Sequence, residues 1–272
     1  MKIGKLIIEF YINSSIHVAL SVFAFIHLTQ TLFTISNDFV TSKFAFFGTI
    51  VGYNFVKYFS LIQTKKVLIR IQLLAIIFLS FISLILSGFY FFQLKMSSQI
   101  VCFLFLILTI LYAVPFVSNY KNIRNWAGIK IYIVAFCWLG VTFFLPIINS
   151  KIPFSTCVIL FALQQLILVF VLLLIFEIID LKLDDPNLKT VPQHIGVENT
   201  KKIGFLLMFF FVIIEISFSN FKIEFFLLKL TLAITTILLL FFANENRSRF
   251  YASFWVESIP IFWWLVVLVV EL

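Results

Sequence analysis

Hydrophobic residues run along this chain in long stretches, and short polar clusters separate one stretch from the next. A transmembrane helix needs about 20 apolar residues to cross the hydrocarbon core of a bilayer. Stretches of that length predict nine membrane-spanning helices in this chain. The predicted spans cover residues 12–33, 39–62, 67–92, 97–117, 128–148, 154–178, 203–220, 224–243 and 252–271.

The composition favours a polytopic membrane protein. Hydrophobic residues make up 62% of the 272 residues and charged residues only 12%, whereas soluble domains average about 25% charged residues. No linker or low-complexity tract divides the chain, which predicts one all-α domain over residues 1–272. The net charge of +8 would indicate nucleic acid as the partner of a soluble protein. In a membrane protein it indicates basic cytoplasmic loops near anionic headgroups, so the expected partner is the lipid bilayer and not nucleic acid.

Lysines and arginines predict the orientation of the spans, because cytoplasmic loops carry an excess of them. With the N-terminus in the cytoplasm, fourteen of these residues fall on the cytoplasmic side and five on the other. The chain is therefore predicted to be an integral, multi-pass protein with a cytoplasmic N-terminus. Residues 1–5 are basic, but no small-residue cleavage site follows them. We therefore interpret the first apolar stretch as a span and not as a signal peptide.

One polar segment, which follows the sixth predicted span on the cytoplasmic side, carries the candidate chemistry. Glu177, Asp180 and Asp184 are spaced i, i+3 and i+7, so on a helix they lie along one face. A divalent cation relieves the repulsion between such carboxylates, and Mg²⁺ usually binds one or two of them together with substrate phosphates. The spacing therefore predicts a site for Mg²⁺ and a diphosphate. The alternative is a solvated loop, in which the acids face water and pair with Lys182 and Lys189.

The polar residues inside the apolar stretches are weaker candidates. His17 and His27 do not share a helix face, so each is expected to be a buried structural histidine. Glu215 and Glu257 have no evident partner in the sequence, and Gln164 is a candidate for facing a cavity. The three cysteines lie in apolar stretches without a CxxC spacing, which predicts apolar packing and neither metal ligation nor disulfides.

Two segments resemble motifs of the UbiA-type intramembrane prenyltransferases. Asp180-x-x-x-Asp184, followed by Thr190-Val-Pro192 and then Gly196, is similar to the family's second aspartate-rich motif. The segment that begins with Tyr112-Ala-Val-Pro115 looks like the family's connection between its fourth and fifth helices. The resemblance implies nine helices around a central cavity, with both motif regions on the cytoplasmic side.

The chain departs from the family in the first aspartate-rich motif. In the family, this motif ends the second helix as an asparagine followed by two or three aspartates at helical spacing. Here only Asn54 matches, and Lys57 stands close to the position of one aspartate. Lys57 is predicted either to replace the charge of one Mg²⁺ or to form a structural ion pair with Asp180 or Asp184.

The resemblance implies Mg²⁺-assisted transfer of a polyprenyl group from a polyprenyl diphosphate to an unknown lipophilic acceptor. Asp180 and Asp184 would bind the metal, and with Lys57 they form the predicted catalytic set. Tyr112 is a candidate for lining the cavity. The predicted diphosphate-binding residues are Asn54, Lys57, Lys121, Arg124 and Lys130. The alternative is a catalytically degenerate relative that binds an isoprenoid or lipid diphosphate, or a protein partner. A small transporter is disfavoured, because the spans lack matching segments interrupted by Gly or Pro.

Overall fold

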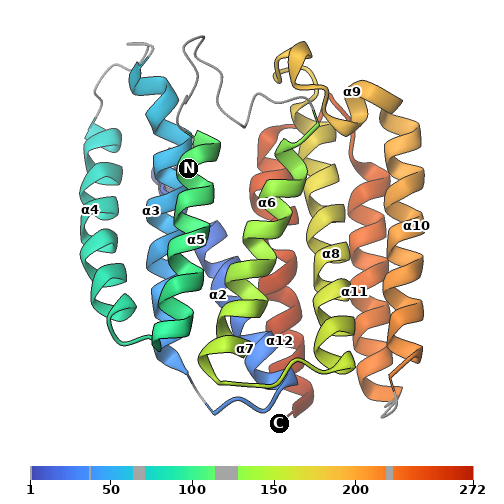
Figure 1. Ribbon diagram of the computed structural model, residues 1–272. Helices are drawn as coiled ribbons and strands as arrows, with labels where there is room; N and C mark the ends of the chain where they lie inside the picture. Colours follow the sequence, from blue (N-terminus) through green and yellow to red (C-terminus); the bar gives the residue numbers. More distant parts are fainter. Residues whose placement is uncertain (1, 37, 64–70, 114–127, 219–222, 272) are drawn as a thin grey trace. The chain divides into compact units, whose positions relative to one another are not determined.

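The computed structural model describes residues 2–36, 38–63, 71–113, 128–218 and 223–271, and these residues form helices joined by short turns (Figure 1). There is no β-strand within these ranges. Five helical segments are long and apolar enough to cross a membrane, and a sixth qualifies if the bent pair Gly4–Asn13 and Ile16–Leu32 is one span. The five are Ile71–Phe91, Lys130–Asn149, Thr156–Asp180, Ile223–Phe242 and Tyr251–Val270. The structure thus supports an all-α, multi-pass membrane protein.

The helices group into two compact units that alternate along the sequence. Unit 1 comprises Met1–Val114 and Gly140–Ile152, and unit 2 comprises Pro115–Leu139 and Pro153–Leu272. The segments that correspond to the two aspartate-rich motifs therefore belong to different units.

The first unit is built around a helix whose surface is mostly apolar, with buried polar residues such as His17, Ser21 and Thr29 between the apolar ones. Its elements are α1 (Lys2–Asn13), α2 (Ile16–Leu32), α3 (Phe39–Gln63), α4 (Ile71–Phe91), α5 (Met96–Ala113), the π-helix η2 (Gly140–Phe144) and α7 (Leu145–Asn149). α2 packs against α3, η2 and α7, and its residues Phe25 and Ile26 are fully buried. A helix that is mostly apolar all round is typical of a buried position. α3 packs in addition against α4 and α5.

A hydrogen-bond network joins the ends of three helices in unit 1. Asp38, which precedes α3, accepts hydrogen bonds from the backbone N–H and the hydroxyl of Thr41 and from the Asn149 side chain at the end of α7. The Asn149 side-chain oxygen in turn accepts hydrogen bonds from the Lys95 N–H (3.1 Å) and the Ser98 hydroxyl (3.0 Å) at the start of α5. The network gives hydrogen-bond acceptors to backbone N–H groups that the first turn of a helix leaves unpaired.

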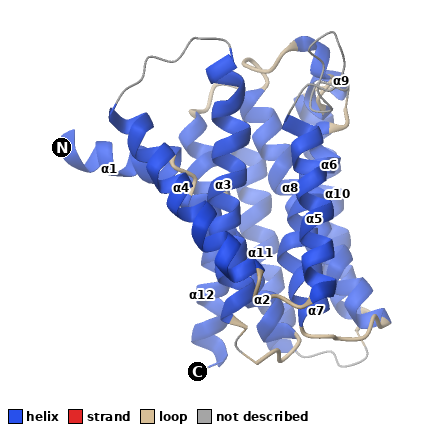
Figure 2. Ribbon diagram, turned by 60° about the vertical axis from the view of Figure 1, so that its left-hand side comes forward, coloured by secondary structure: helices blue, strands red, loops and turns tan. Residues whose placement is uncertain are grey.

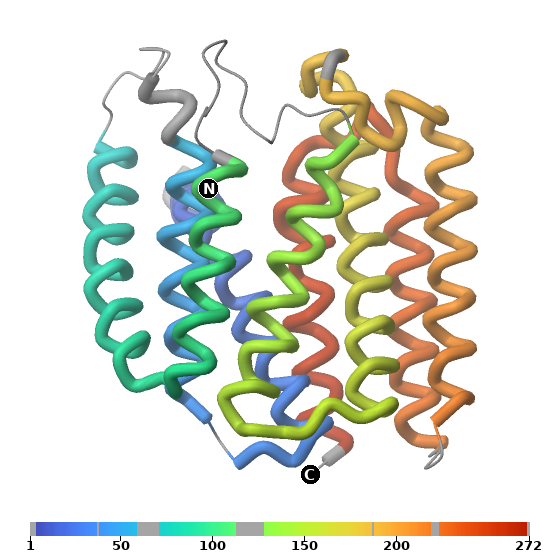
Figure 3. Tube along the Cα trace, viewed as in Figure 1, coloured from blue at the N-terminus to red at the C-terminus, as the bar shows by residue number. Residues whose placement is uncertain are grey.

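The second unit is built around α8. Its elements are α6 (Lys130–Leu139), α8 (Thr156–Asp180), the 3₁₀-helix η3 (Pro186–Leu188), α9 (Val191–Ile195), α10 (Val197–Ile216), α11 (Ile223–Phe242), the π-helix η4 (Tyr251–Val256) and α12 (Ile259–Glu271). α8 packs against α6, α10, α11 and η4, which buries Leu168, Leu174 and Ile178 completely. Figure 3 shows the chain leaving α8, turning through α9 and returning along α10. α10 and α11 approach closely where Gly204 faces Leu240.

Candidate functional site

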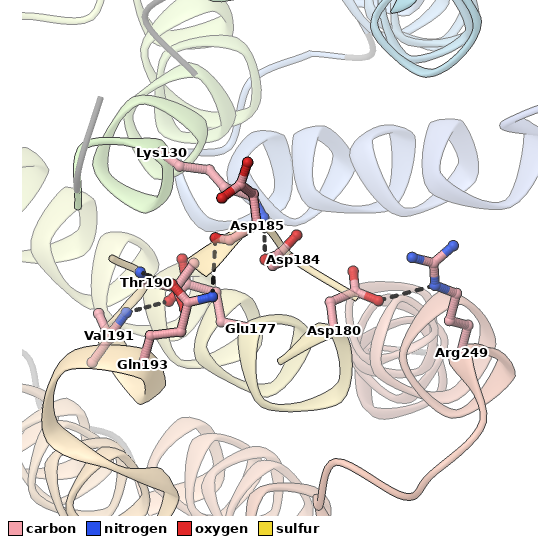
Figure 4. A network of polar contacts seen from close by, with 9 residues as sticks. All are labelled: Lys130, Glu177, Asp180, Asp184, Asp185, Thr190, Val191, Gln193 and Arg249. Atoms are coloured by element: carbon pink, nitrogen blue, oxygen red, sulfur yellow. Dashed lines mark hydrogen bonds and ion pairs between the residues drawn. The ribbon is translucent and has the colours of Figure 1, made fainter. Parts of the chain in front are cut away.

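The last turn of α8 and the segment after it bring the candidate acidic residues next to basic and amide partners (Figure 4). The buried Glu177 points to the backbone of the segment that follows η3. Its carboxylate accepts a hydrogen bond of 3.0 Å from the backbone N–H of Val191, in the first turn of α9. The Gln193 side chain accepts a second hydrogen bond of 3.0 Å, from the N–H of Thr190. Glu177 therefore anchors the Thr190-Val-Pro192 segment to the end of α8.

Asp184 forms the best-shielded ion pair of this segment. Its carboxylate lies 2.9 Å from the Lys130 ammonium, and the two side chains are only 13% and 19% exposed. Lys130 begins α6, and the start of that helix is held in place because the Gly128 N–H donates to the Leu188 carbonyl (2.9 Å). Gly128 has φ of +73°, a left-handed conformation that favours glycine. The backbone thus fixes Lys130 beside Asp184, which brings two predicted site residues together.

Asp180 points to a different partner. Its carboxylate accepts a hydrogen bond of 3.1 Å from Arg249, on the segment before η4. The Arg249 side chain is 68% exposed, so this pair is worth at most about 1 kcal/mol. The loop interpretation predicted Lys182 and Lys189 as partners of these acids. Lys182 instead pairs with Glu245 (3.3 Å).

Asn54 is used for packing within unit 1. This 4%-exposed residue accepts a hydrogen bond from the Ser15 hydroxyl (2.8 Å) and donates to the Ser14 carbonyl (3.1 Å) and the Ser80 hydroxyl (2.9 Å). These contacts join α3 to α4 and to the turn between α1 and α2. The side-chain oxygen and amide of Asn54 are both occupied, so a diphosphate would have to compete with three internal hydrogen bonds.

Lys57 also has partners within unit 1. Its ammonium donates to the backbone carbonyl (3.2 Å) and the side-chain oxygen (3.3 Å) of Asn13, the last residue of α1. A cation at the C-terminus of a helix is favoured by the helix dipole. Tyr112, the cavity candidate, is buried in α5. Lys121 and Arg124 lie outside the described residues, so their predicted contact with diphosphate remains a prediction.

The acidic residues fit a metal that arrives with its substrate better than a resident ion. Among the described residues, no three His, Cys, Asp or Glu side chains gather as a metal site. Asp180 and Asp184 each have a cationic partner instead. Mg²⁺ nevertheless needs only one or two carboxylates when substrate phosphates complete its coordination. Asp184, alone or with Asp180, suits that kind of Mg²⁺ binding.

A second charge cluster, which was not predicted from the sequence, lies inside unit 2. Glu215 on α10, which had no evident partner in the sequence, forms an ion pair with Lys229 on α11, and both side chains are less than a tenth exposed. Lys229 also donates to the Gln164 side-chain oxygen (2.8 Å), and the Gln164 amide donates to Glu215 (3.2 Å). The ammonium stands 4.3 Å from the centre of the Phe161 ring. Lys229 lies within α11, inside the predicted span 224–243, although the orientation prediction counted it among the five basic residues on the non-cytoplasmic side.

A signal for this cluster was present in the sequence. An acid and a lysine stand at similar distances on either side of the connection between the seventh and eighth predicted spans. Antiparallel helices joined by a short connection place such positions at one level, and ionisable groups inside a membrane usually pair.

Comparison of the chain with protein-family models, with curated proteins and with solved structures found no match. The resemblance to UbiA-type prenyltransferases therefore rests on the sequence motifs alone.

Proposed function

We propose that this chain is a nine-span, UbiA-like membrane protein with a cytoplasmic N-terminus, which binds the Mg²⁺-complexed diphosphate head of an isoprenoid lipid at the end of α8. The observation that carries the proposal is the shielded ion pair between Lys130 and Asp184. Both residues belong to segments that resemble the family's motif regions.

The charges of this pair match those of the proposed ligand. A Mg²⁺ diphosphate presents a cation, which a carboxylate binds, and anionic oxygens, which an ammonium binds. On binding, Lys130 and Asp184 would exchange their mutual contact for one contact each with the ligand. Neither charge is then left unpaired, which matters because removing the partner of a buried charge costs about 3–5 kcal/mol.

Prenyl transfer is the second candidate function. It is favoured by the Thr190-Val-Pro192 segment, which Glu177 holds against the end of α8, next to Asp184. In this reaction the bond between the prenyl carbon and the diphosphate oxygen breaks, and its electron pair leaves with the diphosphate. The acceptor supplies the electron pair for the new bond and loses a proton. Lys130 would stabilise the charge on the departing diphosphate, whereas the packing roles of Asn54 and Lys57 argue for binding over catalysis.

Binding of farnesyl and geranylgeranyl diphosphate to the full-length protein in lipid nanodiscs tests the proposal. We expect binding that needs Mg²⁺ and that falls about tenfold or more, or at least 1.4 kcal/mol, in Lys130→Gln and Asp184→Asn. Lys182→Gln is the matched control, because its ion pair with Glu245 is half-exposed and belongs to the same segment. This variant should bind as the wild type does.

A variant with both charges removed keeps the test independent of folding. Lys130→Gln/Asp184→Asn leaves no unpaired charge, so it should stay folded and still fail to bind. Unchanged binding in this folded double variant would refute the proposal, and so would equal affinity for farnesol, which lacks the diphosphate. Release of diphosphate by the wild type with an acceptor, and not by Asp184→Asn, would establish transfer. Binding without release would identify a binding protein.

A further inference from the structure

The first helix carries a narrow polar stripe on an otherwise apolar surface. Positions 2, 5, 9 and 13 of α1 are Lys, Lys, Glu and Asn, so successive polar residues are three or four positions apart. Residues at this spacing share one side of a helix. The remaining positions are apolar, apart from Gly4. This is the pattern of an amphipathic helix with a wide apolar face.

α1 is bent away from the helix that follows it. The two axes meet at 60°, and the bend lies at Ser14 and Ser15, where Ser15 has φ of +63°. α2 has 17 residues and so rises about 26 Å at about 1.5 Å per residue. That rise nearly equals the hydrocarbon thickness of about 30 Å. Figure 2 shows α1 turned sideways from the helices that follow it. If α2 crosses the hydrocarbon, α1 lies near one surface of the membrane and runs toward the membrane plane.

Contacts from α3 hold the bend in this position. The carbonyl of Asn13 accepts hydrogen bonds from the Lys57 ammonium (3.2 Å) and the Tyr58 hydroxyl (3.0 Å). The next two residues, Ser14 and Ser15, bind the Asn54 side chain. Three residues of α3 thus fix the C-terminal end of α1, while its N-terminal part extends beyond them.

The apolar face of α1 is largely bare of protein contacts among the described residues. Leu6, Ile7 and Ile8 are 55%, 61% and 45% exposed. On the polar stripe, the Lys5 and Glu9 side chains are 80% and 51% exposed and lie 3.9 Å apart. Three adjacent exposed aliphatic residues on α1 need an apolar environment. The bilayer would supply it, because the neighbouring helix α2 would already lie in the bilayer.

We infer that α1 is an interfacial helix, which binds the surface of a membrane that contains anionic lipids. Its apolar face enters the boundary between headgroups and acyl chains, where amphipathic helices bury that face about 5–10 Å deep. Its polar stripe faces the headgroups, and the exposed Lys5 supplies attraction to anionic lipid. Asn54, Lys57 and Tyr58 position the helix, which gives the remnant of the first motif a structural task.

Two single-cysteine variants on opposite sides of α1 test this assignment in the full-length protein. Residues Cys102, Cys137 and Cys157 are first replaced by alanine, and Ile7→Cys and Glu9→Cys are then labelled with an environment-sensitive fluorophore. The protein is reconstituted in vesicles of phosphatidylcholine with phosphatidylglycerol. We expect the label at position 7 to resist aqueous iodide and to be quenched by lipids with a nitroxide near the headgroup. The label at position 9, only two residues away, should be quenched by iodide.

Other placements of α1 give different results. Equal iodide quenching at both positions would show a helix in water, and protection of both by a protein partner in detergent would show a protein-binding face. Strongest quenching at position 7 by nitroxides at the bilayer centre would show that α1 continues the span of α2. Each of these results would overturn the inference. The lipid charge is tested by Lys5→Gln with the label at position 7. This variant should lose protection from iodide relative to its parent in vesicles that contain phosphatidylglycerol, and should match its parent in pure phosphatidylcholine.

Discussion

Single charged residues in this protein are held by partners from other helices. Glu215 and Lys229 are almost completely buried, and Gln164 completes their hydrogen bonds. Their energetic importance lies less in the attraction itself than in the absence of water to solvate either charge alone. A buried ion pair contributes little net stability compared with apolar residues, but losing one partner is costly.

At this scale we predict that Lys229→Met destabilises unit 2 by about 3–5 kcal/mol, because Glu215 is left without its cation in a buried site. Lys229→Met/Glu215→Gln should recover most of this loss, since it removes both charges and keeps similar volumes. Unfolding of the purified protein by SDS in mixed micelles measures both values. If the double variant is as unstable as Lys229→Met, the ion pair itself stabilises unit 2, in addition to preventing an unpaired buried charge.

Sequence spacing alone does not determine which charges pair. Asp184 binds Lys130, which is 54 positions away, and Glu215 binds Lys229 across a hairpin. The end of the sixth predicted span indicated that Glu177, Asp180 and Asp184 lie near one helix end. The i, i+3, i+7 spacing predicted one helix face, but α8 ends at Asp180 and Asp184 lies beyond it. It did not reveal that each has a different partner, because those partners come from helices whose packing is set by many apolar contacts.

Among the helices, close approach depends on small residues and on local distortions. The π-helix η2 begins at Gly140, and a Cβ at this position would overlap the ring of Phe105 on α5. The position therefore needs glycine for contact between helices, in agreement with the small residues typical of membrane helix interfaces. The apolar pattern predicted a span here. It did not predict the π-helix η2, because an additional residue in a helical turn does not change the hydropathy of the segment.

For this element we predict that Gly140→Ala costs about 1–3 kcal/mol, since the added methyl group must displace an aromatic ring in a packed interface. Gly88→Ala in α4 is the control, because a Cβ there meets no atom within 4 Å. It should be neutral or stabilising by up to about 1 kcal/mol, as alanine favours the helix. Both are measured by the same unfolding titration. Equal effects would mean that the contact with Phe105 does not constrain the helix.

For the molecule as a whole, apolar stretches were a good guide to the helices because hydrocarbon admits few alternatives to a helix for an apolar chain. Helices occupy most of the described part of the predicted windows, and five of them, or six with the bent pair α1 and α2, are long and apolar enough to cross a membrane. α8 illustrates the point, as its 25 residues rise about 37 Å and exceed the roughly 30 Å of hydrocarbon. If α8 crosses the bilayer, Lys151 and Lys182, which flank it, face opposite sides of the membrane.

The excess of cytoplasmic lysine and arginine predicts which side each of these two residues faces. In a cysteine-free background, Lys151→Cys should react with a membrane-impermeant maleimide in intact spheroplasts. Lys182→Cys should react only after permeabilisation, because it stands on the predicted cytoplasmic side. Gel-shift labelling reads out both. The reverse labelling pattern would establish the opposite orientation, and labelling of both positions in intact spheroplasts would show that α8 does not cross the bilayer.

The pairing of Glu215 with Lys229 also constrains how this protein is made. Inserted alone, α10 would carry Glu215 and α11 would carry Lys229 into lipid without its partner, which is costly. The two helices are thus best released from the insertion machinery as a preassembled hairpin. A nascent chain that ends before Lys229 would hold Glu215 without its partner, so we expect α10 to enter the membrane less readily until α11 has been made.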